Sequence, residues 1–94
     1  MHAVMVEVSV DTSQEQAARQ VVRDVVVPTA KSLDGFAGGT WCRALGHNAG
    51  RSVLLFDSED NAKAAAEQIR NQGPPPGAPV TMNAVHAYEV IAQA

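Results

Sequence analysis

Two kinds of apolar pattern alternate along the chain in a regular order. Strand-like runs cover residues 1–10, 38–45, 51–56 and 80–92, and helical spacing covers residues 13–26 and 58–72. The resulting order, β-α-β-β-α-β, is that of the ferredoxin-like arrangement. The 94 residues are therefore predicted to form a single α+β domain, in which a four-stranded antiparallel sheet carries two helices on one face.

The first strand and the first helix each carry a distinctive apolar pattern. The even positions of residues 4–10 are all valine, whereas the odd positions mix apolar, polar and charged residues. Because side chains alternate between the faces of a strand, the valine face is expected to meet the helices. Pro28 disfavours helical geometry at Val27, so a kink or a break is predicted there, before a last turn over residues 30–33.

Glycine and proline residues mark the connections. Gly38 and Gly39 stand near the start of the second strand, where glycine is typical of a bulge or of a close backbone approach. Residues 46–50, with the sequence GHNAG, are predicted to form the hairpin loop before the third strand. Residues 73–79, GPPPGAP, are expected to end the second helix and to form a stiff, polyproline-like connector.

The third strand predicts a partner for the sheet. Residues 53–56 are apolar at four consecutive positions, which is typical of a central strand that is buried on both faces. The first and third strands are central in the ferredoxin-like order, and two helices cover only one face of the sheet. A second copy of the chain is the simplest cover for the other face, so a homodimer is expected.

Charge and composition exclude several classes of function. The formal charge is −3 and the seven basic residues are scattered, so the basic stripe of a nucleic-acid-binding protein is missing. No apolar run approaches the ~20 residues that span a bilayer, and the first ten residues lack the pattern of a signal peptide. The lone Cys42 cannot form an internal disulfide, which agrees with a cytoplasmic protein. The excess of arginine over lysine, with abundant alanine and valine, is typical of a bacterium of high GC content.

Few residues point to a particular chemistry. The three histidines lack the spacing of a ligand pair and Cys42 has no CxxC partner, so no metal site is expected. His86 and Tyr88 share one face of the last strand, where they either line a cavity or are hydrogen-bonded at an interface. Trp41 lines a small-molecule pocket or anchors the core. Glu7 either enters a cavity on the sheet or is paired or hydrated.

Catalytic residues cannot be assigned from motifs. No serine lies in a GxSxG context, and no phosphate-binding loop of the GxxxxGK[ST] type occurs. The glycines of residues 35–39 precede a strand instead of opening a helix, which argues against a dinucleotide site.

The chain nevertheless resembles a known superfamily along nearly its whole length. The resemblance rests on the element order, the chain length, the step Gly35-Phe36-Ala37-Gly38, the strand-to-helix passage over residues 55–59 and the closing residues 88–90. Together these features resemble the dimeric α+β barrel superfamily and, within it, the antibiotic biosynthesis monooxygenase-like domains. The resemblance implies dimers whose sheets face each other, with a pocket between sheet and helices in each subunit. It implies either cofactor-independent oxygenation of aromatic polyketides or haem degradation.

The sequence departs from the haem-degrading members of this superfamily at three positions. Those members use an asparagine on the first strand, a tryptophan at the end of the third strand and a histidine on the second helix. This sequence has Val8 and Phe56 near the first two positions and no histidine in residues 58–72, so neither haem degradation nor any cofactor is expected.

Two hypotheses follow for the function. The first is a small-molecule-binding, enzyme-like domain that resembles cofactor-independent monooxygenases. Its pocket-lining candidates are Trp41, Phe56, His86, Tyr88 and Glu7, and its ligand would be a small aromatic molecule. The alternative is a non-catalytic binding or stress-related dimeric module whose core is filled by its own side chains.

Overall fold

The computed structural model describes all 94 residues and has the predicted order of elements. The strands are β1 (His2–Val10), β2 (Phe36–Arg43), β3 (Ala49–Phe56) and β4 (Val80–Glu89). The first helical segment consists of η1 (Thr12–Gln14), α1 (Glu15–Val21), η2 (Val22–Val26) and α2 (Val27–Lys31), and the second is α3 (Glu59–Gln72). The ferredoxin-like α+β fold class is therefore confirmed.

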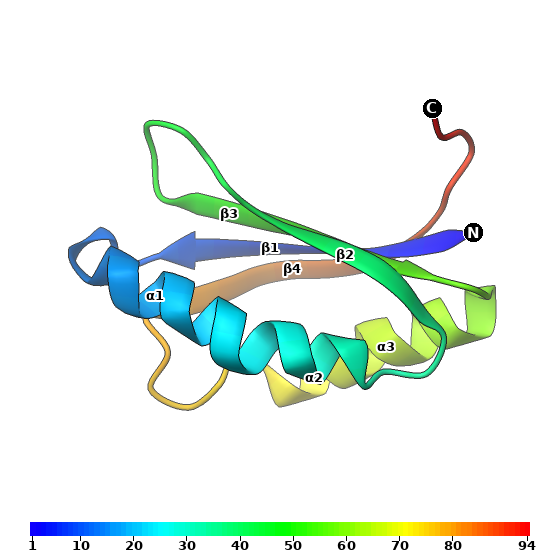
Figure 1. Cartoon of the computed structure of the whole chain (residues 1–94), viewed down its shortest axis with the longest axis horizontal. Coiled ribbons are helices and arrows are strands. Elements are labelled where there is room, and N and C mark those ends of the chain that lie inside the picture. The colour runs from blue at the N-terminus through cyan, green and yellow to red at the C-terminus, as the bar shows by residue number, and fades with distance from the viewer.

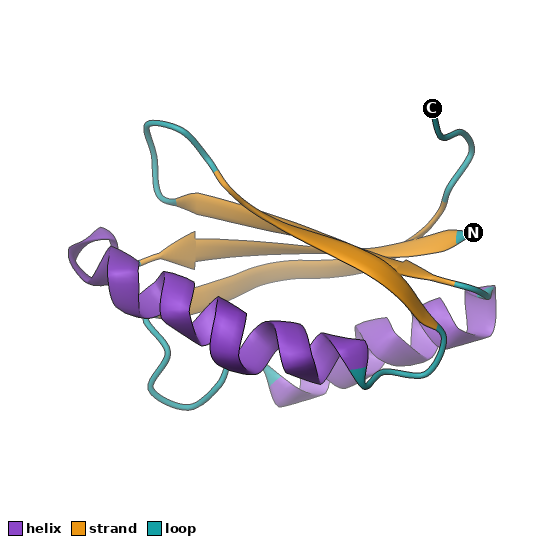
Figure 2. Cartoon of the chain, in the orientation of Figure 1, coloured by secondary structure: helices purple, strands orange, loops and turns teal.

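All four strands form one antiparallel sheet in the order β2-β3-β1-β4. The first and third strands are central, as the sequence predicted. Figures 1 and 2 show both helical segments on the same side of the sheet, which leaves the opposite side without a helix. We call that side the open face. No helix of the chain is long and apolar enough to cross a membrane.

The core lies between the sheet and the helices. Val4 and Val6 of β1 pack there with Leu54 and Phe56 of β3, so the valine face meets the helices as predicted. Phe56 is fully buried, and its ring meets that of Phe36 edge to face at a centroid distance of 6.1 Å. Helix α3 contributes three buried alanines, Ala62, Ala65 and Ala66. Their small side chains let α3 lie close to the sheet.

The first helix differs from the sequence prediction at Pro28. The helix does not break at Val27 but continues to Lys31 through η2, which is a π-helical segment. The Val27 N–H donates to the Val22 carbonyl, five residues back. Proline lacks an N–H and its ring crowds the preceding turn of an α-helix, whereas a wider π turn accommodates it. Pro28 then occupies the first turn of α2, where its missing N–H costs nothing.

Strand ends and connections also differ slightly from the predictions. Strand β2 starts and ends two residues earlier, and its register with β3 shifts between Phe36 and Gly38, which confirms the bulge predicted from the glycine pair. Strand β4 ends at Glu89 instead of residue 92. Gly73 ends α3 with a φ of 65°, as expected. The proline connector contains a turn, because the Ala78 N–H donates to the Pro75 carbonyl at 3.0 Å.

Candidate ligand cavity

A cavity of about 370 Å³ lies between the sheet and the first helical segment. Its floor is formed by residues of all four strands, its roof by η2 and α2, and one wall by the end of α3 and the proline connector. The lining residues are Val6, Val8, Val22, Val25, Val26, Thr29, Ala30, Leu33, Trp41, Ser52, Leu54, Ile69, Gln72, Gly73, Pro74, Pro75, Pro76, Val80 and Met82. Ligand sites of proteins commonly start at about 300 Å³, so this space is large enough for a small organic molecule.

Trp41 forms part of the floor on β2. Its indole folds back over Gly39, where an added Cβ would lie 2.8 Å from the Trp41 Cη2 atom and 3.1 Å from the Leu54 Cδ2 atom. The close backbone approach predicted from the glycine pair is therefore an approach of the indole to Gly39. The absence of a side chain at Gly39 leaves room for the ring beside Leu54 at the cavity wall.

The roof is loosely packed over the cavity. No residue of η2 is buried, and Val25 keeps 44% of its surface exposed although it is apolar. Val22 and Val26 are half-buried and also line the cavity. Valines that face a cavity lack the van der Waals partners that a filled core would give them. A bound molecule could supply those partners.

The lining is free of charge. It contains no aspartate, glutamate, lysine, arginine or histidine, and its polar side chains are Thr29, Ser52 and Gln72. Thr29 and Gln72 are exposed, whereas Ser52 is half-buried in the floor. An ionised ligand group would lose its hydration here without gaining a counter-charge, so the cavity suits a neutral ligand with few polar atoms.

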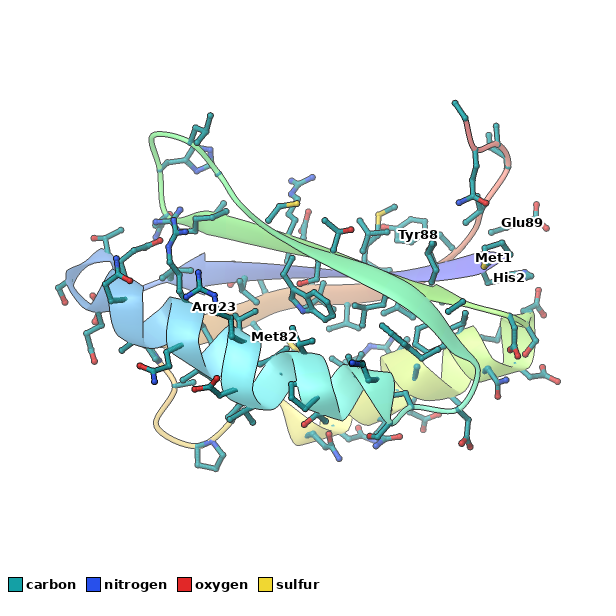
Figure 3. The ribbon with its side chains drawn as sticks, viewed as in Figure 1. Met1, His2, Arg23, Met82, Tyr88 and Glu89 are labelled. Carbon is teal, nitrogen blue, oxygen red and sulfur yellow. The ribbon has the colours of Figure 1, made fainter.

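The open face carries the other polar candidates from the sequence. His86 and Tyr88 project from β4 away from the helices, and their rings meet edge to face at a centroid distance of 6.4 Å. Figure 3 shows Tyr88 and Met82 of the same strand on opposite sides of the sheet. Glu7 also lies on the open face, where its carboxylate pairs with Arg51 at 3.0 Å. These side chains border a second, smaller pocket of about 140 Å³.

The structure thus brings the candidate residues together in two groups. Trp41 lines the cavity, whereas His86, Tyr88 and Glu7 share the open face, separated from Trp41 by the thickness of the sheet. Phe56 lines neither space because it is fully buried in the core.

Sequence reasoning missed the roof and the proline wall. The helical spacing of the valines in residues 22–26 indicated only a buried stripe, and residues 74–76 indicated only a connector. The sequence signal for an irregular roof was Pro28, which the structure accommodates with a π segment, and such segments are frequent at functional sites.

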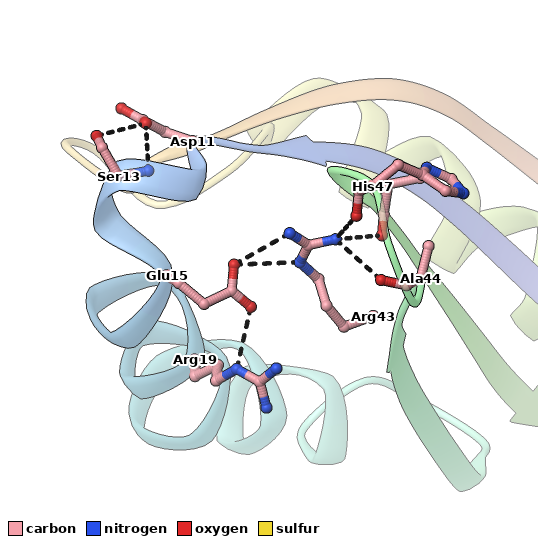
Figure 4. Close-up of polar contacts among 8 residues, drawn as sticks. Asp11, Ser13, Glu15, Arg19, Arg43, Ala44 and His47 are labelled. Carbon is pink, nitrogen blue, oxygen red and sulfur yellow. Dashed lines mark hydrogen bonds and ion pairs between the residues drawn. The ribbon is translucent and has the colours of Figure 1, made fainter.

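An ion-pair network connects the first turn of α1 to the hairpin loop between β2 and β3, as Figure 4 shows. The Arg43 guanidinium donates to the Glu15 carboxylate at 3.1 and 3.2 Å and also to the carbonyls of Ala44, His47 and Ala49. The hydrogen bond from Arg43 holds the pKa of Glu15 below its ordinary value, with Arg19 adding to the effect. This network anchors the helix that forms the cavity roof.

The histidines and carboxylates do not form a metal centre. No group of three or more histidine, cysteine, aspartate or glutamate side chains gathers around one point. His2 lies 3.9 Å from the Glu59 carboxylate, whose pKa is lowered mainly by its hydrogen bond from Lys63. This pair is remote from the cavity lining.

The structure defines a ferredoxin-like α+β domain, and solved structures share this fold. The haem degrader MhuD of Mycobacterium tuberculosis, solved with two haems bound in its active site, matches with a TM-score of 0.76 and 14% identity over 100% of this chain and 99% of its own. HapK of Hahella chejuensis matches with a TM-score of 0.67 and 13% identity over 100% and 96%. A monooxygenase from the gene ActVA-Orf6 of Streptomyces coelicolor, solved with nanaomycin D, matches with a TM-score of 0.61 and 12% identity over 99% and 89%.

These likenesses concern the fold. No family model matches the chain, and no curated protein matches its sequence. The structural likenesses bear out the ferredoxin-like fold that the sequence resemblance implied.

Proposed function

We propose that this chain binds a small, neutral, planar organic molecule in the cavity between its sheet and its helices, as an enzyme-like domain that resembles cofactor-independent monooxygenases. One observation carries the proposal: a space of about 370 Å³, lined mainly by apolar residues and free of charged ones, lies beneath a loosely packed roof. The alternative of a filled core is disfavoured by that space. The structural likeness to a monooxygenase that was solved with nanaomycin D supports an aromatic ligand.

The residues of the cavity do not fit haem. None of the lining residues is a histidine, and the carboxylates of a haem would find no cation there. Met82 provides the only side-chain sulfur of the lining. Its thioether could ligate iron, but no other residue of the lining would provide a second iron ligand. The likeness to a haem degrader therefore does not extend to haem binding in this proposal.

An oxygenase acting in this cavity would bind its substrate in the neutral form and would depend on that substrate to give an acidic C–H proton to solvent water, which leaves the reactive carbanion. No lining side chain is an acid or a base at neutral pH, so the protein would contribute positioning and the exclusion of water. Molecular oxygen would be the oxidant. The proposed role of the chain is therefore to bind the ligand, and no catalytic residue is assigned.

A homodimer through the open face belongs to the same proposal. Met5 and Tyr88 keep 40% and 44% of their surfaces exposed there, beside the half-buried Val53 and Leu55. An exposed apolar patch on one face of a sheet is typical of a protein interface. The dimer is expected in the cytoplasm of a bacterium, without nucleic-acid or membrane partners.

The test uses Trp41, the only tryptophan of the chain, as the reporter. Titration with 1,8-dihydroxyanthraquinone, a planar and neutral tricyclic probe, should change the Trp41 emission saturably. Val25→Phe should fill the roof side of the cavity and weaken binding, whereas Gln20→Phe on the exposed face of α1 should not, and both variants keep Trp41 as the only tryptophan. If no probe in a broad aromatic panel binds while iodide and acrylamide fail to quench Trp41, the filled-core alternative replaces this proposal.

A further inference from the structure

Ser52 is the one half-buried polar side chain in the floor of the cavity. On β3, Ser52 lies at every-second-residue spacing with Gly50, Leu54 and Phe56, and the last two belong to the core beneath the helices. Because side chains two residues apart lie on the same face of a strand, the Ser52 hydroxyl projects toward the helices. In the sheet, Ser52 lies between Val6 of β1 and Trp41 of β2.

The hydroxyl of Ser52 has no partner within the chain. None of the side-chain hydrogen bonds involves it. Its cross-strand neighbours on the floor, Val6 and Trp41, present apolar surface to the cavity. The Ser52 Oγ atom is nevertheless open to solvent, since it is not among the buried side-chain atoms that lack a partner. A ligand that displaces water from this hydroxyl must replace the hydrogen bond, or the hydroxyl loses free energy. Thr29 and Gln72 are more exposed than Ser52 and belong to the roof and the wall of the cavity.

We propose that Ser52 is a specificity-determining residue, whose hydroxyl forms a hydrogen bond with a carbonyl or hydroxyl oxygen on the buried edge of the ligand while Trp41 packs against the ring. This inference rests on the proposed ligand cavity and adds the polar group that the ligand must carry. A serine hydroxyl both donates and accepts, so it suits a ketone and an alcohol alike. A hydrocarbon of the same shape leaves the hydroxyl unpaired.

The preference is measured with three bicyclic probes that differ at one position: tetralin, 1-tetralone and 1-tetralol. Their affinities for the full chain are compared by isothermal titration calorimetry. For the unmodified chain, the ketone and the alcohol should bind about fivefold more tightly than tetralin, which is the effect of one hydrogen bond. Ser52→Ala should abolish this difference while leaving tetralin binding unchanged or stronger.

Two control variants separate the hydroxyl from the fold. Ser52→Thr keeps a hydroxyl at the same position and should retain the preference for the oxygenated probes. Thr40→Ala removes a hydroxyl from the open face of β2, next to Trp41 in sequence, and should retain it as well. Far-UV circular dichroism of each variant shows whether the fold is intact. If Ser52→Ala does not fold, Ser52→Cys takes its place, because its thiol is similar in size but only a weak hydrogen-bonding group, and it should likewise lose the preference.

The outcomes distinguish this inference from the proposed function. If tetralin binds but the ketone and the alcohol bind no more tightly, or if Ser52→Ala keeps their preference, the role of Ser52 is refuted and the cavity remains a ligand site. If none of the three probes binds, the cavity itself is refuted and the inference falls with it.

Discussion

The contact between Gly39 and Trp41 allows a quantitative prediction about the cavity wall. A Cβ at residue 39 would lie 2.8 and 3.0 Å from the Trp41 Cη2 and Cζ3 atoms. Ordinary carbon contacts begin at about 3.5 Å, so the indole would have to move by roughly 0.7 Å. Overpacking of this kind costs about 1–3 kcal/mol, and the lower entropy of the unfolded chain offsets about 0.4–1 kcal/mol of that. Gly39→Ala should therefore lower the free energy of unfolding by about 1–2 kcal/mol.

Urea unfolding measures this effect, with Trp41 emission and circular dichroism as independent probes. For an m-value of about 1–2 kcal/mol per molar urea, the midpoint should fall by about 0.5–2 M. The native emission of Trp41 should shift because the displaced indole enters the cavity. Gly39 has no positive φ that would strain an alanine, so the contact itself is the expected cause.

A double-mutant cycle isolates the contact. Phenylalanine at position 41 lacks the two indole atoms that approach Gly39, so Gly39→Ala should cost clearly less in the Trp41→Phe background, where only the 3.1 Å approach to the Leu54 Cδ2 atom remains. The cycle is followed by circular dichroism, since Trp41→Phe removes the fluorophore. Equal costs of Gly39→Ala in both backgrounds would refute the packing of the indole over Gly39 and, with it, the position of the cavity wall.

Four further results are expected. Phe56→Ala should destabilise the chain by about 3–5 kcal/mol in urea unfolding, since Phe56 is fully buried; a cost below 1 kcal/mol would contradict its place in the core. The Glu15 carboxylate stabilises the fold at pH values above its pKa in the unfolded chain, and this contribution is lost as the pH falls through its lower pKa in the folded chain. The urea midpoints of the unmodified chain and Glu15→Gln should therefore differ at pH 7 and converge by pH 2. A difference that does not change with pH would argue against the Arg43 network. Sedimentation should give twice the 9.9 kDa chain mass, and Met5→Glu should yield monomers while Gln20→Glu does not; a monomeric unmodified chain rules out the dimer. Haemin titration should give no stoichiometric Soret shift, whereas a shift that His86→Ala abolishes would identify a haem site on the open face.

The fold was predictable because its signals are local and repeated. The period-two valines of residues 4–10 and the four apolar residues 53–56 each identify a central strand, and the structure has both strands in the middle of the sheet. Gly38 and Gly39 indicated the bulge. A kink or a break was predicted before Pro28, and the structure has a π-helical segment within a continuous helix instead of a break, because a wider π turn accommodates the proline ring.

The candidate site was only partly predictable, because it depends on which face of the sheet each strand presents. Trp41 was identified as a candidate pocket residue, and it does line the cavity. Alternation within β4 placed His86 and Tyr88 on one face, but only the register with β1 identifies that face as the open one. Ser52 carried no motif. Its importance arises from the cavity above it and from its lack of a partner, which are properties of the packing.

The most direct test of the ligand cavity is a crystal structure of the chain with 1,8-dihydroxyanthraquinone. The account predicts density for the probe between Trp41 and the valines of η2, with one probe oxygen within hydrogen-bonding distance of the Ser52 hydroxyl. Density for the probe only on the open face, between His86 and Tyr88, would contradict the account, as would a cavity closed by its own side chains.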